Sequence, residues 1–145
     1  MAQPKGEKQQ YYGGLAISPD GAYLCYASDT KLLVWLDMKT GKEVASFDPL
    51  PESRSDTHGS ISAVNYTPSG LHLVITECKN SGSNSMAKTL KMPAVMGAGV
   101  APHVSAVHSH GGPRVFGCDI SRDGQLALTG SHGGAHIWNV SSRTR

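Results

Sequence analysis

Short apolar stretches alternate with polar turns along this chain, and one such arrangement occurs three times. The copies cover residues 16–24, 65–73 and 119–126. Each passes from an apolar stretch through a hydroxyl residue and a tight turn into a second apolar stretch. The turns contain Asp20, Gly21, Gly70, Asp123 and Gly124. Because glycine tolerates the positive φ that such turns require, each copy predicts a β-hairpin.

The repeats extend past the hairpins into further strands. Trp35 lies 14 residues after Gly21, and Trp138 lies 14 residues after Gly124, so each tryptophan marks a third strand. Besides the two strands around Gly21, strands are predicted over residues 32–36 and 43–47 in the first copy, 61–67, 72–78, 86–92 and 103–108 in the second, and 114–121, 126–131 and 136–140 in the third. The fold class is therefore all-β, with 11 to 12 strands.

Across roughly residues 13–145, this pattern resembles the WD-repeat β-propeller family. The resemblance rests on the run Ser18-Pro19-Asp20-Gly21 followed by Trp35, and on the run Ser121-Arg122-Asp123-Gly124 followed by Trp138. It implies blades of four antiparallel strands that stack around an axis. It also implies that a histidine, a serine or threonine, an aspartate and the tryptophan form a buried hydrogen-bonded set in each blade.

The sequence supplies these implied sets only in part. The matching positions are Asp29 and Trp35 in the first copy, and His110, Thr129 or Ser131, and Trp138 in the third. His132 stands where the third copy should have its aspartate. No histidine precedes the first copy, and the second copy has no tryptophan.

The resemblance divides the chain into a tail or closing strand and three blades. The divisions are residues 1–12, residues 13–58, residues 59–112 with a long flexible insertion near 79–102, and residues 113–145, which lack an outer strand. Three blades cannot close a ring, since propellers have about four to eight. We therefore expect an incomplete ring that belongs to a longer propeller. The alternatives are two chains that pool three blades each, and a different β-sandwich-like arrangement.

The chain is nearly neutral, with 13 Lys and Arg against 11 Asp and Glu and a formal net charge of +2. This balance supplies no broad basic field for binding nucleic acid. Contacts to RNA or to an acidic partner would have to use a few basic residues, namely Lys88, Lys91, Arg114, Arg143 and Arg145. For residues 88–92 the alternative is an edge strand that lysines protect from further pairing.

Seven histidines raise the question of a metal site, above all His103, His108 and His110 with His132 and His136 later in the chain. His103 and His108 would point to opposite faces of one strand, whereas His108 and His110 share a face. No carboxylate lies between them, so no metal site is predicted. The sequence also has no nucleophile elbow, no paired carboxylates and no phosphate-binding glycine loop before a helix. We therefore expect no enzymatic activity, no cofactor and no small-molecule substrate.

Cys25, Cys78 and Cys118 are widely spaced, and this spacing predicts buried thiols rather than disulfides or metal ligands. The N-terminal residues are polar and lack the apolar core of a signal peptide. The longest apolar runs are far shorter than the roughly 20 residues that cross a bilayer. We therefore expect an intracellular protein of a reducing compartment, in the nucleus, nucleolus or cytoplasm, without membrane contact.

These observations predict a scaffold that mediates protein–protein interactions within a large multi-subunit assembly. The alternatives are a subunit that contacts RNA through its basic residues, and a half-propeller completed by a second chain. A narrower resemblance is carried by Tyr12-Gly13-Gly14, by residues 40–47 and by the second repeat without tryptophan. It is to the family of the transducin-β-like subunit of the small-subunit processome, and it implies a role in a ribonucleoprotein of ribosome biogenesis.

Overall fold

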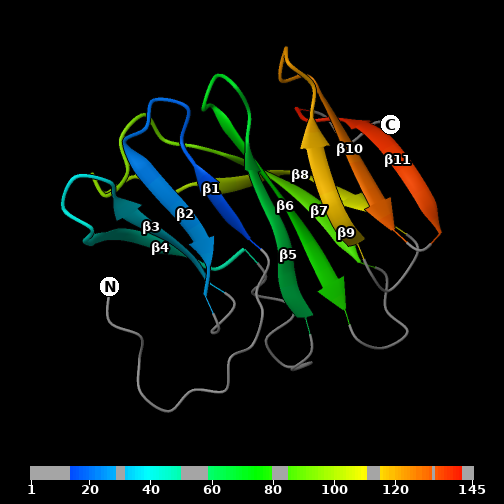
Figure 1. The fold of residues 1–145 in the computed structure, drawn as a ribbon, viewed down its shortest axis with the longest axis horizontal. Helices are drawn as coiled ribbons and strands as arrows, with labels where there is room; N and C mark the ends of the chain where they lie inside the picture. Colours follow the sequence, from blue (N-terminus) through cyan, green and yellow to red (C-terminus); the bar gives the residue numbers. More distant parts are fainter. Residues whose placement is uncertain are drawn as a thin grey trace.

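A computed structural model describes residues 14–28, 32–49, 59–79, 85–110, 115–131 and 133–141. Over these ranges the chain forms three antiparallel sheets and no helix (Figure 1). The first sheet contains β1 (Leu15–Ile17), β2 (Tyr23–Ala27), β3 (Leu33–Asp37) and β4 (Glu43–Phe47). The second contains β5 (Gly59–Tyr66), β6 (His72–Lys79), β7 (Met86–Lys91) and β8 (His103–Ser109). The third contains β9 (Val115–Ile120), β10 (Leu126–Ser131) and β11 (Gly134–Asn139).

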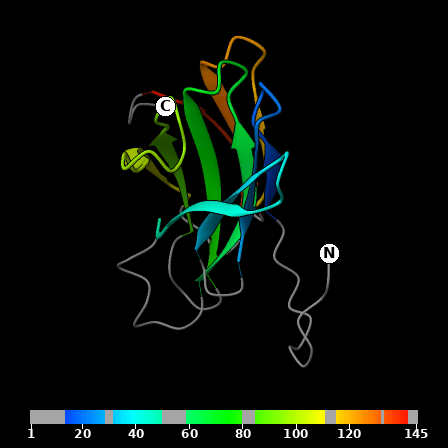
Figure 2. The same cartoon turned by 90° about the vertical axis from the view of Figure 1, so that its left-hand side faces the viewer.

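Each strand pairs with the next strand in the sequence, so every sheet is an antiparallel meander. The predicted all-β class is confirmed, with four, four and three strands in the described residues. The sheets lie one after another in chain order in Figure 1, and the turned view in Figure 2 has β4 of the first sheet in front of the others. No helix of the described residues is long and apolar enough to span a membrane.

Within the segment predicted as a long flexible insertion near residues 79–102, the structure describes residue 79 and residues 85–102 and contains the strand predicted over residues 86–92. β7 lies within it and pairs on one side with β6 and on the other with β8. The loop after β7 carries Met92 and Met96 into the core between the first and second sheets. Glycine-rich composition therefore marks a loop here, but a loop that packs against its neighbours.

Two hydrophobic cores hold the three sheets together. The first core lies between the first and second sheets and includes Cys25, Leu33 and Trp35 on one side with Leu73 and Ile75 on the other. The second core lies between the second and third sheets and contains Val74, Ala87, Ala127, Trp138 and Val140. Each core removes one whole face of a thin sheet from water, which is the main source of stability in stacked repeats.

Strand β6 contributes to both cores because successive side chains of a strand point to opposite faces. Leu73 and Ile75 enter the first core, and Val74 between them enters the second. The second sheet is therefore covered on both faces. This explains the continuous apolar run Leu73-Val74-Ile75, which lacks the alternation expected of a strand with one face in water.

The three hairpin turns share one hydrogen-bonding scheme. In the first turn, Ser18 Oγ donates to Asp20 Oδ1 at 2.6 Å and accepts the backbone N–H of Tyr23 at 3.0 Å. In the third turn, Ser121 Oγ donates to Asp123 Oδ1 at 2.6 Å and accepts the N–H of Leu126 at 2.9 Å. In the second turn, Thr67 and Ser69 take the places of Ser18 and Asp20. The turn glycines Gly21, Gly70 and Gly124 have φ values of 73°, 74° and 74°.

Consecutive turns also contact one another. A Cβ at Gly70 would lie 3.6 Å from Cδ of Pro19 in the preceding turn. A Cβ at Gly124 would lie 3.4 Å from Cδ of Pro68 in the turn before it. The turns of the three sheets thus form a row in which Gly70 and Gly124 each lie beside the proline of the preceding turn.

Ser121→Ala is expected to raise the pKa of the Asp123 carboxyl, because the Ser121 hydroxyl is the main cause of that lowered pKa. The pKa of Asp20, held down chiefly by Ser18, should not move and serves as an internal control. Carboxyl ¹³C NMR titration measures both pKa values. Since folding lowers these pKa values, their contribution to stability is present above the ordinary value of 3.8 and is lost as the pH falls through the lowered ones. Equal shifts at both aspartates would contradict the local origin proposed here.

Gly14→Ala is expected to lower the free energy of unfolding by about 1–3 kcal/mol through overpacking. An added Cβ would lie 2.6 Å from Cγ2 of Val64 and 3.3 Å from Cβ of Ala27, both in the interface between the first two sheets. Gly130→Ala is the matched control, since a Cβ at Gly130 meets no atom within 4 Å. Urea unfolding followed by circular dichroism compares the two variants, and equal midpoints would contradict the steric argument.

Candidate functional site

The outer face of the third sheet is an exposed apolar surface. Leu126 and Leu128 on β10 and Ile137 on β11 are 42%, 45% and 61% exposed. Strand alternation places Ala127 and Trp138 on the opposite face, in the second core. We call the three exposed side chains, Leu126, Leu128 and Ile137, the outer patch.

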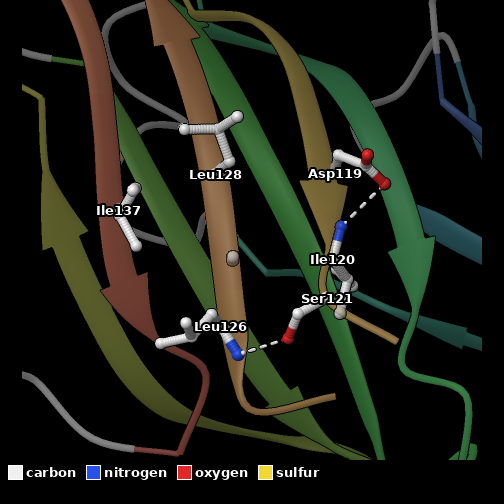
Figure 3. Close-up of a pocket in the computed structure, with 7 residues that line it drawn as sticks. Asp119, Ile120, Ser121, Leu126, Leu128 and Ile137 are labelled. Atoms are coloured by element: carbon white, nitrogen blue, oxygen red, sulfur yellow. Dashed lines mark hydrogen bonds between the residues drawn. The ribbon is translucent and has the colours of Figure 1, made fainter. Parts of the chain in front are cut away.

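An open hollow of about 240 Å³ lies on the outer patch (Figure 3). Its lining consists of Asp119, Ile120, Ser121, Leu126, Ala127, Leu128 and Ile137. At its edge, Oδ1 of Asp119 accepts the N–H of Ile120 at 2.9 Å. The hollow is therefore mainly apolar with a few polar groups along one side, which suits a protein side chain better than a charged ligand.

The first sheet exposes a similar surface at the other end of the stack. Leu15 and Ile17 on β1 are 66% and 55% exposed, while Ala16 between them packs on the first core. In the pairing of β1 with β2, Tyr26 lies opposite Leu15 and Leu24 lies opposite Ile17. Both ends of the three-sheet stack thus present apolar strand faces.

Three residues that the sequence suggested for a hydrogen-bonded set meet between the second and third sheets. Trp138 Nε1 donates to Thr129 Oγ1 at 3.2 Å, and Nε2 of His110 contacts the same oxygen. All three side chains are buried. Of the two hydroxyl candidates, Thr129 is the one in the set, because Ser131 Oγ instead donates to the backbone oxygen of Gly134 at the start of β11.

The corresponding set in the first sheet takes a different form. Trp35 Nε1 donates to the hydroxyl of Tyr66 at 2.8 Å, and Tyr66 lies at the end of β5 in the second sheet. Burial raises the pKa of Tyr66 to about 12, so its hydroxyl stays neutral. Asp29, the partner suggested by the sequence, lies outside the described residues. The sequence shows only an aromatic residue before the second turn, and nothing local points to a bond between two sheets.

The basic residues proposed for RNA contact do not form one surface. Lys88 is buried, and its ammonium donates to the backbone oxygen of Pro49 at 2.9 Å. The structure thus corrects both interpretations of Lys88, because the side chain is inaccessible and β7 is an interior strand rather than an edge. Lys91 is exposed at the end of β7. Arg114, Arg143 and Arg145 lie outside the described residues.

Cys25 and Cys118 are free thiols. Burial raises the pKa of both, and that of Cys118 reaches about 11. The thiols are therefore neutral at physiological pH and poor nucleophiles or metal ligands in that state. Cys25 is fully buried as predicted, whereas Cys118 is half-buried. The side chain of Cys78 lies outside the described part of the chain.

Three histidines converge beside the Trp138 set. His108 on β8 and His110 just after it are buried, and both meet His136, which comes from β11 of the third sheet. The sequence pattern indicated that His108 and His110 share a face, but it could not place His136 against them. His103, on the same strand as His108, is exposed and outside this group.

Comparison with known proteins relates the stretch from β8 to β11 to a known repeat family. Residues 102–139 match the family described as "WD domain, G-beta repeat". The chain contains a WD40 repeat. The repeat begins just before β8 and ends with β11, so it joins the outermost strand of the second sheet to all three strands of the third. His110, Thr129 and Trp138 all lie within this WD40 repeat.

Solved structures place the whole stack in a β-propeller. The crystal structure of the Cps50 (Swd1) β-propeller domain from Myceliophteria thermophila superposes with a TM-score of 0.68 at 14% sequence identity. The match covers 91% of this chain and 40% of that domain. The three sheets are therefore blades of a partial β-propeller, and the chain spans less than half the length of the matching domain. No curated protein matches the sequence, and the narrower resemblance to the processome subunit stays a prediction.

Proposed function

We propose that this chain is a non-enzymatic WD-repeat scaffold that binds other protein subunits of an intracellular multi-subunit assembly. The observation that carries the proposal is the outer patch on the third blade, together with Leu15 and Ile17 on the first. Contiguous apolar surface of this kind marks protein interaction sites in soluble proteins. Flat sheet faces also lack the deep cavity that a small substrate would need.

The occupant proposed for the outer patch is a further blade of a longer propeller. The second blade already covers the inner face of the third with Val74 and Ala87, which are small apolar side chains on flat strands. The outer patch offers the same chemistry, with leucine and isoleucine side chains spaced along two paired strands. Packing of a similar blade face would bury the patch in the way the second core is buried. This chain covers 40% of the matching propeller domain, so that domain contains a larger part beyond the matched region.

The double variant Leu128→Lys/Ile137→Lys tests this assignment. In the native assembly, the wild-type chain should elute at a mass well above 15.3 kDa. Cross-links should connect the third blade to β-strands of the further blade, and the double variant should lose these cross-links. Met38→Lys is the control, since Met38 is an exposed side chain in the turn after β3. A mass of two chains would identify the occupant as a second copy, whereas a soluble 15.3 kDa wild-type monomer would contradict the proposal.

We further propose that this assembly is a ribonucleoprotein of ribosome biogenesis. The support for this proposal is the set of short motifs at residues 12–14 and 40–47 and the exposed Lys91, which is available for a phosphate contact. If Lys91 binds RNA, Lys91→Ala should reduce the slope of log K against log salt by about 0.7, the value for one contact to a single strand. Lys39→Ala, in an exposed turn of the first blade, is the control. RNA binding that does not change with salt would favour the protein scaffold alone.

A further inference from the structure

Two pairs of strand positions bring His108, His110 and His136 together between the second and third blades. His108 and His110 are two residues apart on and just after β8, so they share a face. His136 and Trp138 are likewise two residues apart on β11, and Trp138 faces the second blade. The hydrogen bond from the backbone N–H of His110 to the oxygen of Ser85, at 2.9 Å, extends the β7–β8 pairing and holds His110 in line with the strand.

The ring contacts fix how the three imidazoles face one another. His108 stacks on the Trp138 indole with centroids 5.6 Å apart and an interplanar angle of 8°. His110 and His136 stack at 4.5 Å and 26°. His108 meets both other histidines edge-on, at 5.4 Å and 5.6 Å. The three rings thus lie against one another, and one ligand nitrogen of each lies within 4.8 Å of the others.

The nitrogen separations agree with metal coordination. His108 Nε2 and His136 Nδ1 are hydrogen-bonded at 3.3 Å, with the donor set by the tautomers of the two rings. Two nitrogens bound to a tetrahedral zinc ion at 2.0–2.1 Å would be about 3.3–3.4 Å apart. One nitrogen of His110 lies within 4.8 Å of the corresponding nitrogens of the other two rings. His110 would have to approach by no more than about 1.5 Å to complete a set of three ligands at the tetrahedral spacing.

We propose that His108, His110 and His136 form a binding site for a divalent late transition-metal ion, Zn²⁺ being the reference case. Neutral imidazole suits Zn²⁺, Cu²⁺ and Ni²⁺, and three histidines leave a fourth tetrahedral position for water. His136 is only half-buried, so water can reach this side of the cluster. The sequence pattern includes His136 among the candidate histidines but does not place it against His108 and His110, so no metal site is predicted from it.

Thr129 contacts a residue of this site, His110, and holds its ring in place. The Thr129 hydroxyl accepts the Trp138 N–H and contacts Nε2 of His110, which orients the His110 ring. Thr129 also lies opposite His136 in the β10–β11 pairing. An ion held here would join the outermost strand of the second blade to β11 of the third. Its role would be to fasten the two blades of the WD40 repeat to each other.

The test uses the full chain without an affinity tag, stripped with a chelator and titrated with Zn²⁺ alone by calorimetry. We expect one ion per chain, and a loss of affinity of at least about tenfold in His108→Gln and in His136→Gln. His103→Gln should bind like the wild type, since His103 is an exposed histidine on the same strand as His108. Zn²⁺ should also raise the thermal midpoint of the wild type and not that of His136→Gln.

A second measurement needs no variant. Co²⁺ added to the stripped wild-type chain should give the intense visible absorption of a tetrahedral site. The weak absorption of an octahedral ion would overturn the three-histidine assignment. So would wild-type Zn²⁺ binding no stronger than that of the double variant His108→Gln/His136→Gln, or an equal loss in His103→Gln. Circular dichroism of each variant identifies any loss of affinity that comes from unfolding, and in that case the Co²⁺ spectrum decides.

Discussion

Trp138→Ala is expected to lower the free energy of unfolding by about 3–5 kcal/mol. Trp138 is the largest side chain in the core between the second and third blades, and it is almost fully buried. Its removal leaves a cavity against Val74 and Ala87, takes away the ring on which His108 stacks, and deprives Thr129 of a hydrogen-bond donor. Urea unfolding followed by circular dichroism measures the loss.

Two variants separate the contributions of volume and hydrogen bonding at Trp138. Trp138→Phe keeps most of the ring but removes the N–H, and it should cost less than the alanine variant while still exceeding the roughly 1 kcal/mol of a single hydrogen bond. Leu71→Ala is the surface control, since Leu71 is a large apolar side chain that is 60% exposed. We expect it to change stability by less than about 0.5 kcal/mol. A Trp138→Ala variant as stable as Leu71→Ala would show that the third blade does not pack on the second.

Trp35→Ala is expected to have an effect of similar size, about 3–5 kcal/mol, at the other interface. Trp35 is fully buried among Cys25, Leu33 and Ile75, and its N–H donates to Tyr66 across the boundary between the first and second blades. The measurement is again urea unfolding. Because the chain has only two tryptophans, each alanine variant leaves one indole whose fluorescence reports on the interface that was not changed.

The energy of the hydrogen bond between Trp35 and Tyr66 can be measured separately from the packing of the two side chains. A double-mutant cycle of Trp35→Phe and Tyr66→Phe should give a coupling energy of about 0.5–1.5 kcal/mol, since both partners are well removed from water. The cycle of Trp138→Phe with Tyr66→Phe is the control, because these two side chains belong to different cores. A coupling near zero in the first cycle would mean that the hydrogen bond is replaced by water when either partner is lost.

The hairpins and third strands could be predicted because their signals are local. Gly21, Gly70 and Gly124 mark turns whose φ only glycine adopts easily, and the constant distance from two of them to a tryptophan marks a strand of fixed length. These features depend only on residues within one blade and not on the neighbouring blade. The predicted positions of Thr129 and Trp138 follow from the same spacing.

The parts that the sequence did not indicate depend on packing between blades. Lys88 is of a residue type that is usually exposed, but it is buried and its ammonium donates to the backbone oxygen of Pro49. Tyr66 and His136 act on partners 31 and 28 residues away in the chain. A local sequence pattern cannot predict that two side chains of neighbouring blades will meet, since this depends on how far one blade is rotated relative to the next.

The row of turns has a consequence for how the length of a blade can vary. The glycine-to-proline contact between neighbouring turns is nearly the same for both pairs, although 49 residues separate the glycines of one pair and 54 those of the other. Five extra residues are thus absorbed by loops elsewhere in the blade without altering the spacing of the stack. Insertions and deletions should therefore be tolerated in those loops. A single residue inserted between Ser18 and Gly21, in contrast, would disrupt the contact between neighbouring turns.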